Sequence, residues 1–316
     1  MHQTPWTELN FMESALIDIS MADHNDLEKY KFIIHEYKKA HHQWIKKSDE
    51  LTREFAGVFH SAFLRWAVTV NGLNVAAEKY SSMDWKNANK GLTVSGIRHN
   101  ESNSQYEAII LKTWDGNMAA QVSKSSIPML AGWAFCNMYA CIEEFILKLC
   151  RIYLEEHPDY LIQGQEFREL RKLYSAQKLD PTLRSKWFEK LNVRLDDWHK
   201  KIVFKGMEKI FNKYITFSKI EMPNKYKGLA TYSDIGKTLG GISLIRNCFI
   251  HGVTTVPKEL EEFCHDFTGL AFHFVAGSKF RIGLTDLALF ECFASKLTAT
   301  LNLSYCQLAY PEIYTK

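Results

Sequence analysis

Three polar residues that could act on a phosphate ester lie close together late in the chain: Arg246, Asn247 and His251. On a helix that runs from Ser233 to His251, they share one face with Ser243, at positions i, i+3, i+4 and i+8. The arginine guanidinium is a planar fork of donors that fits a phosphate, and histidine can transfer a proton near neutral pH. These residue types are therefore suited to binding a phosphate and moving a proton.

The remaining faces of this predicted helix are apolar. Six residues cover most of its circumference: Leu239, Ile242, Leu244, Ile245, Cys248 and Phe249. Such a helix is expected to be buried, and an unpaired guanidinium is costly to bury. The polar face must therefore meet a partner carboxylate, a water-filled cleft, a subunit interface or an anionic ligand. Gly252 suits the first position after the helix, where the negative end of the helix dipole favours a protonated His251.

Chemistry alone favours a plainer interpretation of the polar face. An arginine, an asparagine and a histidine on one helix more often form a satisfied structural cluster than a catalytic site. The chemistry of these residues by itself therefore favours the structural cluster over the catalytic site.

The first half of the chain is expected to be largely helical. Asn25 or Asp26 can cap a helix over residues 27–55, and a second apolar helix is expected over 51–80. Residues 81–105 are polar and rich in Gly, Asn and Ser, which predicts a loop, and residues 106–114 suit a short strand.

A long helix is predicted to begin at Ser125–Pro128 and to end before Pro158. Its apolar residues recur at three-to-four spacing: Phe135, Met138, Ile142, Phe145, Leu149 and Ile152. Helical pieces around Trp187 and over 197–217 follow, and then the helix that carries Arg246. A β-hairpin over 269–284 and a final helix capped by Thr285 or Asp286 complete the chain.

These elements predict an all-α fold, mainly a helical bundle, with a small β-hairpin. We expect an N-terminal helical region over residues 1–125 and a second domain over 126–316, with a basic helical insertion at about 160–230. The chain of 316 residues is 46% hydrophobic, which is enough for a sizeable core.

Positive charge is concentrated in one segment. Residues 166–227 hold sixteen Lys or Arg and eight Asp or Glu, a net of +8, whereas the whole chain carries +3 and the rest therefore −5. This excess suits an anionic partner such as nucleic acid, or else a solvated helical face rich in lysine. Six of its aromatic residues could stack on bases, although such residues more often pack inside: Trp187, Trp198, Phe204, Phe211, Tyr214 and Phe217.

Other features bear on location and cofactors. The seven cysteines form no C-x-x-C pair, which favours a reducing cytoplasmic compartment. The N-terminus lacks a signal-peptide pattern. The most apolar window, 55–73, contains His60, Arg65 and Asn71, which argues against a membrane span. We expect no metal and no cofactor, because no Asp/Glu/His cluster makes a divalent site and Gly236-Lys237-Thr238 lacks the earlier glycine of a P-loop.

The pattern Arg246-Asn247-x-x-x-His251 resembles the R-N-x-x-x-H form of the R-x4–6-H motif of HEPN domains. Residues 129–156 resemble the long amphipathic helix that precedes the motif helix in that superfamily. The predicted order of motif helix, hairpin and long final helix is also similar. The resemblance covers about residues 126–310 and does not extend to residues 1–125.

The resemblance implies a metal-independent endoribonuclease, of the kind found in toxin–antitoxin and antiviral defence systems. By position, Arg246, Asn247 and His251 would be the catalytic residues. The RNA 2′-OH would attack the adjacent phosphate, Arg246 would stabilise the developing charge, and His251 would move a proton. Family members commonly form homodimers in which two motif helices face one cleft, and an antitoxin or an activating partner would be a further partner.

Two alternatives remain open from the sequence. One is a non-catalytic HEPN module that binds RNA or nucleotide or acts as a scaffold. The other is a structural helical protein in which Arg246 pairs with a buried acid. Val253 stands where one subgroup of the superfamily carries a modified tyrosine, which counts against membership of that subgroup. Glu143 and Glu144 could add a carboxylate to the site, although a solvated face suits them better.

Overall fold

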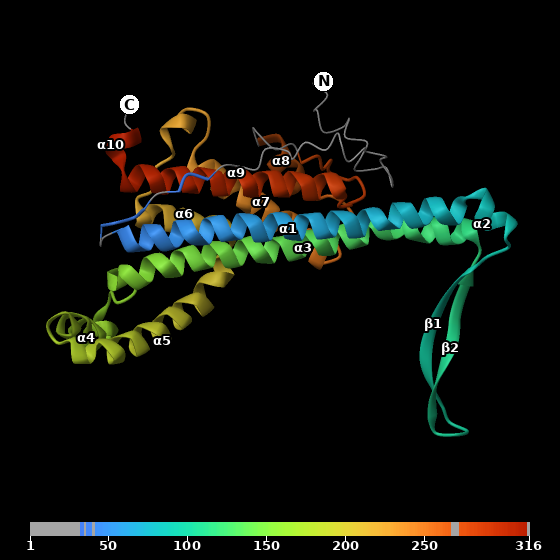
Figure 1. Ribbon diagram of the computed structural model, residues 1–316, viewed down its shortest axis with the longest axis horizontal. Coiled ribbons are helices and arrows are strands. Elements are labelled where there is room, and N and C mark those ends of the chain that lie inside the picture. The colour runs from blue at the N-terminus through green and yellow to red at the C-terminus, as the bar shows by residue number, and fades with distance from the viewer. Residues whose placement is uncertain (1–31, 35, 40–41, 267–271, 315–316) are drawn as a thin grey trace. The chain divides into compact units, whose positions relative to one another are not determined.

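The computed structural model describes residues 32–34, 36–39, 42–266 and 272–314, and these are mainly helical (Figure 1). One antiparallel two-stranded hairpin is present among them. The predicted fold class, mainly α-helical with a small β-hairpin, is confirmed. The helices are α1 (Gln43–Ser81), α2 (Met83–Asn87), α3 (Gly116–Glu156), α4 (Arg168–Leu179), α5 (Arg184–Ile202), α6 (Met207–Ser218), α7 (Tyr232–Ile250), α8 (Lys258–Asp266), α9 (Leu284–Ala309) and α10 (Pro311–Tyr314).

The chain divides into two compact units. Unit 1 contains Ala62–Phe135 and Arg281–Leu289, and unit 2 contains the described parts of Leu27–Ser61, Cys136–Phe280 and Phe290–Lys316. Three of the limits between the units fall inside helices, namely α1, α3 and α9. The expected domain limit at residues 125/126 lies inside α3.

The core of unit 2 forms where the first half of α1 lies along the second half of α3 (Figure 1). Phe55 stacks on Phe145 with ring centres 4.1 Å apart, and Trp44 meets Tyr153 edge-on at 5.0 Å. On α3, five of the six residues of the predicted apolar stripe are buried, namely Phe135, Met138, Ile142, Phe145 and Leu149. The three-to-four spacing therefore identified the packed face of α3 correctly.

The hairpin belongs to unit 1 and consists of β1 (Leu92–Asn100) and β2 (Gln105–Trp114). The strand expected over 106–114 is confirmed, but the loop expected over 81–105 is wrong at Met83–Asn87, which form α2, and from Leu92 to Asn100. The Asn and Ser residues of that stretch hold the turn instead: Asn100 and Asn103 side chains accept the N–H groups of Ser102 and Gln105 at 3.0 Å. The composition of the turn therefore obscured the strand before it.

Residues before α1 do not continue it. A helix was expected over 27–55, yet residues 32–34 and 36–39 are not helical, and residues 27–31, 35 and 40–41 lie outside the described residues. The Asn302 side chain bonds both backbone groups of Ile33, accepting from its N–H and donating to its carbonyl at 2.9 Å. These contacts replace the hydrogen bonds that a helix would supply.

The start of α3 also differs from the prediction. The helix begins at Gly116, where the Asp115 carboxylate accepts the Met118 N–H at 2.8 Å, and Pro128 lies within it. Ser125 and Ser126 donate their hydroxyl protons to the carbonyl of Val122 at 3.0 and 2.8 Å, so they continue the helix rather than cap it. The predicted end is confirmed, since α3 stops at Glu156.

The hairpin predicted over 269–284 is wrong for the residues that are described, 272–284. The turn itself forms, with Gly277 at φ +78°, but the residues after it pair with those that follow α7. Thr255 and Lys279 form an isolated bridge, and Phe280 donates its N–H to the carbonyl of Thr254 at 2.9 Å. The arm after the turn therefore has a partner that local sequence does not reveal.

Within the described residues, no helix combines the length and apolar character needed to cross a membrane.

Candidate functional site

The helix that carries the polar face, α7, begins and ends where the sequence predicts within one residue. Thr231 caps it in a capping box with Asp234, in which each side chain accepts the backbone N–H of the other residue. At the other end, Gly252 has φ +66°, and its N–H binds the carbonyl of Phe249 at 3.1 Å. The Val253 N–H binds the Cys248 carbonyl at 2.9 Å, which completes a Schellman motif.

Burial around α7 follows the predicted division into faces. Leu239, Ile242, Ile245 and Cys248 are buried, and Leu244 and Phe249 are half-buried. Arg246 is half-buried, whereas Asn247 and His251 are exposed. His251 is the last residue of the helical turn, at the carboxyl end of α7. The polar face therefore reaches solvent along its second half.

Arg246 lies on an aromatic ring rather than beside an acid. Its guanidinium carbon is 5.3 Å from the centre of the Tyr139 ring, and its Nη1 donates to Asn247 Oδ1 at 2.9 Å. Among the described residues, no Asp or Glu oxygen lies within 4.0 Å of this guanidinium. The purely structural alternative required such a buried acid, and the described part of the chain does not supply one.

Tyr139 links the guanidinium to a second polar group on α3. Its hydroxyl lies 3.3 Å from both Ser243 Oγ and Glu143 Oε1. Ser243 donates its own proton to the Leu239 carbonyl at 2.7 Å, so its oxygen is free to accept. Burial raises the pKa of Tyr139, so the phenol stays protonated and acts as a donor.

Glu143 and Glu144, the two candidate carboxylates of α3, have different surroundings. Glu144 is exposed and pairs with Lys148 at 2.8 Å, one turn later on the same helix. Glu143 is half-buried and faces the Tyr139 hydroxyl. The solvated interpretation is therefore right for Glu144, while Glu143 belongs to the polar cluster around Arg246.

Cys136 is a further neighbour of Arg246 on α3. Burial raises the pKa of its thiol, and the positive charge of Arg246 works in the opposite direction. Because the burial effect is the larger, Cys136 stays a thiol at neutral pH. A cysteine nucleophile at this site is not favoured.

Sequence reasoning found the α7 residues but missed Tyr139. The local signal was weak: Tyr139 stands beside the buried stripe residue Met138 and four residues before Glu143. Nothing in that spacing shows that the ring faces Arg246, because the contact joins residues more than one hundred positions apart. The sequence alone could not supply this part of the cluster.

The aromatic residues considered as base-stacking candidates in the basic segment are mostly buried. Four of the six aromatic residues considered there are buried, namely Trp187, Trp198, Phe211 and Tyr214. Phe217 is half-buried, and Phe204 is 89% exposed. The described residues contain no group of three or more His, Cys, Asp or Glu side chains arranged to hold a metal ion. All seven cysteines are free of disulfide bonds.

Comparisons with protein-family models, with curated proteins and with solved structures gave no match for this chain. The geometry of α7 and α3 is therefore the ground for a functional proposal, together with the motif in the sequence.

Proposed function

We propose that this protein is a metal-independent endoribonuclease whose catalytic residues are Arg246, Asn247 and His251. The observation that carries the proposal is the state of Arg246. It is half-buried, it is held by a ring and an amide, and no carboxylate oxygen of the described residues lies within 4.0 Å of it. A positive charge held in this way is suited to a phosphate.

The proposed reaction is transesterification. The RNA 2′-OH attacks the adjacent phosphorus and the 5′-oxygen leaves, which produces a 2′,3′-cyclic phosphate and a 5′-hydroxyl end. Arg246 stabilises the negative charge that develops on the phosphate oxygens. His251, exposed at the end of α7, exchanges a proton with the reacting oxygens. Asn247 keeps the guanidinium in place through its bond to Nη1.

The proposed setting is a cytoplasmic toxin or phage-defence effector, active as a homodimer with two α7 helices around one cleft. The seven free cysteines are in keeping with a reducing compartment. The exposed residues at the carboxyl end of α7, Asn247, Ile250 and His251, are available to a second copy. An antitoxin or an activating partner would control the activity.

The test is RNA cleavage in EDTA by the purified full chain. We expect wild-type protein to cleave, and Arg246→Ala and His251→Ala to lower the rate by about 100-fold or more, the usual contribution of a proton-transferring group. Arg65→Ala and His273→Ala are matched controls, because both side chains are exposed and lie outside the cluster. Equal cleavage by all five proteins would contradict the assignment. RNA binding without cleavage by any of them would favour the non-catalytic module.

A further inference from the structure

Helix α4 presents an apolar face that its own chain covers only in part. Leu170, Leu173 and Ala176 lie on one side of this helix and are half-buried, and no residue of α4 is fully buried. Its neighbour α5 buries five residues, namely Trp187, Leu191, Leu195, Trp198 and Ile202. An amphipathic helix in a finished core normally buries its stripe, so α4 lacks part of its packing.

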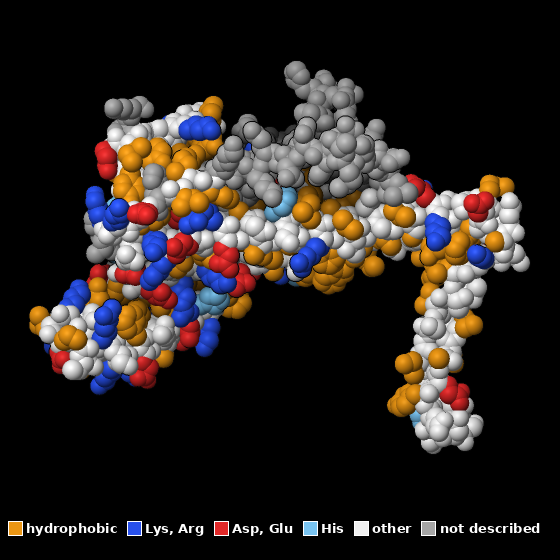
Figure 2. Space-filling view, in the orientation of Figure 1, with side chains coloured by type: hydrophobic (Ala, Val, Ile, Leu, Met, Phe, Trp, Pro, Cys, Tyr) orange, Lys and Arg blue, Asp and Glu red, His pale blue; other side chains and the backbone are white. Residues whose placement is uncertain are grey.

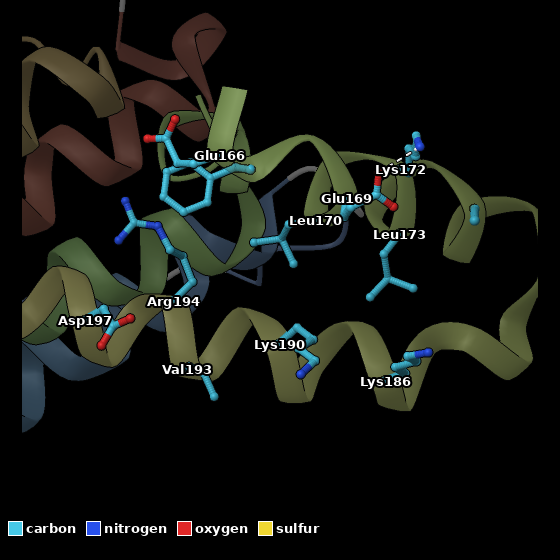
Figure 3. A pocket seen from close by; sticks show the side chains of 12 residues that line it. Glu166, Glu169, Leu170, Lys172, Leu173, Lys186, Lys190, Val193, Arg194 and Asp197 are labelled. Atoms are coloured by element: carbon cyan, nitrogen blue, oxygen red, sulfur yellow. Dashed lines mark hydrogen bonds and ion pairs between the residues drawn. The ribbon is translucent and has the colours of Figure 1, made fainter. Parts of the chain in front are cut away.

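A groove of about 630 Å³ follows this incomplete face. Figure 3 shows Leu170 and Leu173 directed from α4 into the gap between the two helices, with Lys186 and Lys190 on α5 opposite. Val193, 57% exposed, adds apolar surface on the α5 side. The groove contains none of the residues around Arg246, so it is separate from the proposed catalytic site.

One end of the groove carries positive charge that has no partner among the described residues. Lys186 and Lys190 are exposed, one helical turn apart, and neither forms an ion pair there. The other two cations are engaged: Lys172 pairs with Glu169 at 2.7 Å, and Arg194 lies 4.4 Å above the Phe167 ring. Figure 2 shows Lys and Arg side chains, with Asp and Glu among them, around apolar surface over α4 and α5. This pair of lysines favours an acidic group in the occupant.

Three aromatic rings at or near the groove, those of Phe167, Tyr174 and Trp187, are already in contact with other side chains. Trp187 is buried against Tyr174, with ring centres 4.8 Å apart, and Lys178 lies 4.0 Å above the Tyr174 ring. Arg194 covers Phe167 in the same way. The groove therefore offers aliphatic surface rather than free rings, which suits the side chains of a peptide better than stacked bases.

We propose that the α4–α5 groove binds an amphipathic helix of a partner protein, with acidic residues placed against Lys186 and Lys190. The lining spans residues 166–176 of the α4 side, about 16 Å of helix, which accommodates about three turns of the bound helix. Two antiparallel helices with an apolar groove between them are completed by a third helix that fills it. Glu166 and Asp197 line the opposite end and fix the direction of the bound helix, because they favour a basic residue there. This inference does not depend on the proposed ribonuclease activity.

The test is a display selection of helical peptides of about twelve residues on the full chain. The library keeps a stripe of Leu at i, i+3, i+4 and i+7 and randomises the flanking positions between Glu and Lys. We expect selected peptides to carry Glu on the flank that faces Lys186 and Lys190. The double variant Lys186→Glu, Lys190→Glu should weaken these peptides at least tenfold and should prefer peptides with Lys instead. Lys200→Glu, Lys201→Glu is the matched control, since both are exposed on α5 outside the groove.

A second pair of variants tests the apolar floor. Val193→Asp should abolish binding of the selected peptides, and Leu179→Asp should not, because Leu179 is 89% exposed on α4 and does not line the groove. Both sites are exposed enough for the variants to fold. Peptides that bind equally to Val193→Asp and wild type, or a selection without charge preference, would overturn the proposal. A single-stranded RNA oligonucleotide could also displace the peptides and lose its own binding in Val193→Asp. That result would show that the groove binds RNA and would contradict a helix as its occupant.

Discussion

At the scale of single residues, the proposal rests on the surroundings of Arg246. A buried arginine in a finished core is usually paired with a carboxylate, because an unpaired charge is costly there. Here the guanidinium lies on the Tyr139 ring and donates to the neighbouring amide of Asn247. The remaining donors of the fork are therefore available to a ligand on the exposed side of α7.

Tyr139 is expected to act as a positioning residue through its ring. Tyr139→Phe keeps the ring under the guanidinium and should change the cleavage rate by no more than about twofold. Tyr139→Leu removes the cation–π contact, worth about 1 kcal/mol, and should lower the rate by about fivefold. Single-turnover cleavage of one RNA substrate measures both rates. A Leu variant as fast as wild type, with the same melting temperature, would contradict this role.

A buried carboxyl group on α1 gives stability a pH dependence. Asp49 is fully buried, and this burial raises its pKa, while the Asn302 amide that donates to it at 2.6 Å works in the opposite direction. The folded state thus holds the proton more tightly than the unfolded state. The contribution of Asp49 to the free energy of unfolding therefore increases as the pH falls from the raised pKa towards the ordinary carboxyl value of about 4.

The variant Asp49→Asn removes this titration. The melting temperature of wild type relative to Asp49→Asn should therefore rise between pH 7 and pH 4. Thermal unfolding followed by circular dichroism at several pH values measures the difference. A difference that stays constant or falls over this range would contradict the sign.

At the scale of elements, both ends of α7, the last turn of α3 and its apolar stripe could be predicted, and pairings between distant segments could not. Thr231, Asp234 and Gly252 are local signals, and they mark the ends of α7 correctly. The non-helical stretch at Ile33 depends on Asn302, and the bridge from Thr255 to Lys279 depends on two loops. Such contacts join residues far apart in the sequence, so local composition gives no signal for them.

The close packing of α7 on α8 depends on one glycine. A Cβ atom added at Gly241 would overlap the Phe263 ring, whereas one added at Gly240 would meet the carboxylate end of Glu208, which can rotate away. Gly241→Ala should therefore destabilise the protein by roughly 1–3 kcal/mol. Gly240→Ala should be neutral or stabilising by up to about 1 kcal/mol, since alanine favours helix. Urea unfolding measures both, and equal effects of the two substitutions would contradict this packing.

At the scale of the whole molecule, the features on which both proposals rest lie in unit 2. The cluster around Arg246 and the α4–α5 groove both belong to it, and so does the segment of net charge +8. Unit 1 contains the hairpin, whose strands expose apolar residues such as Ile97, Tyr106 and Ile110. The motif in the sequence located the catalytic candidates, but only the structure showed the groove.

Dimerisation through α7 is the expected quaternary state. Light scattering at micromolar concentration should give twice the mass of one chain. Ile250→Asp should give monomers and reduced cleavage, because Ile250 is 42% exposed at the end of α7 beside the proposed site. Ile313→Asp, at a site 56% exposed on α10, is the control and should leave the dimer intact. A monomeric wild-type protein would count against a composite cleft.

The chemistry of the RNA ends tests the central claim most directly. RNA cleaved by the wild-type chain in EDTA is examined by mass spectrometry, together with a substrate in which the 2′-OH at the cleaved position is replaced by hydrogen. The account predicts 2′,3′-cyclic phosphate and 5′-hydroxyl ends, no cleavage of the 2′-deoxy substrate, and loss of both products in Arg246→Ala and His251→Ala. Products with 3′-hydroxyl and 5′-phosphate ends, or the same products from both variants, would contradict it.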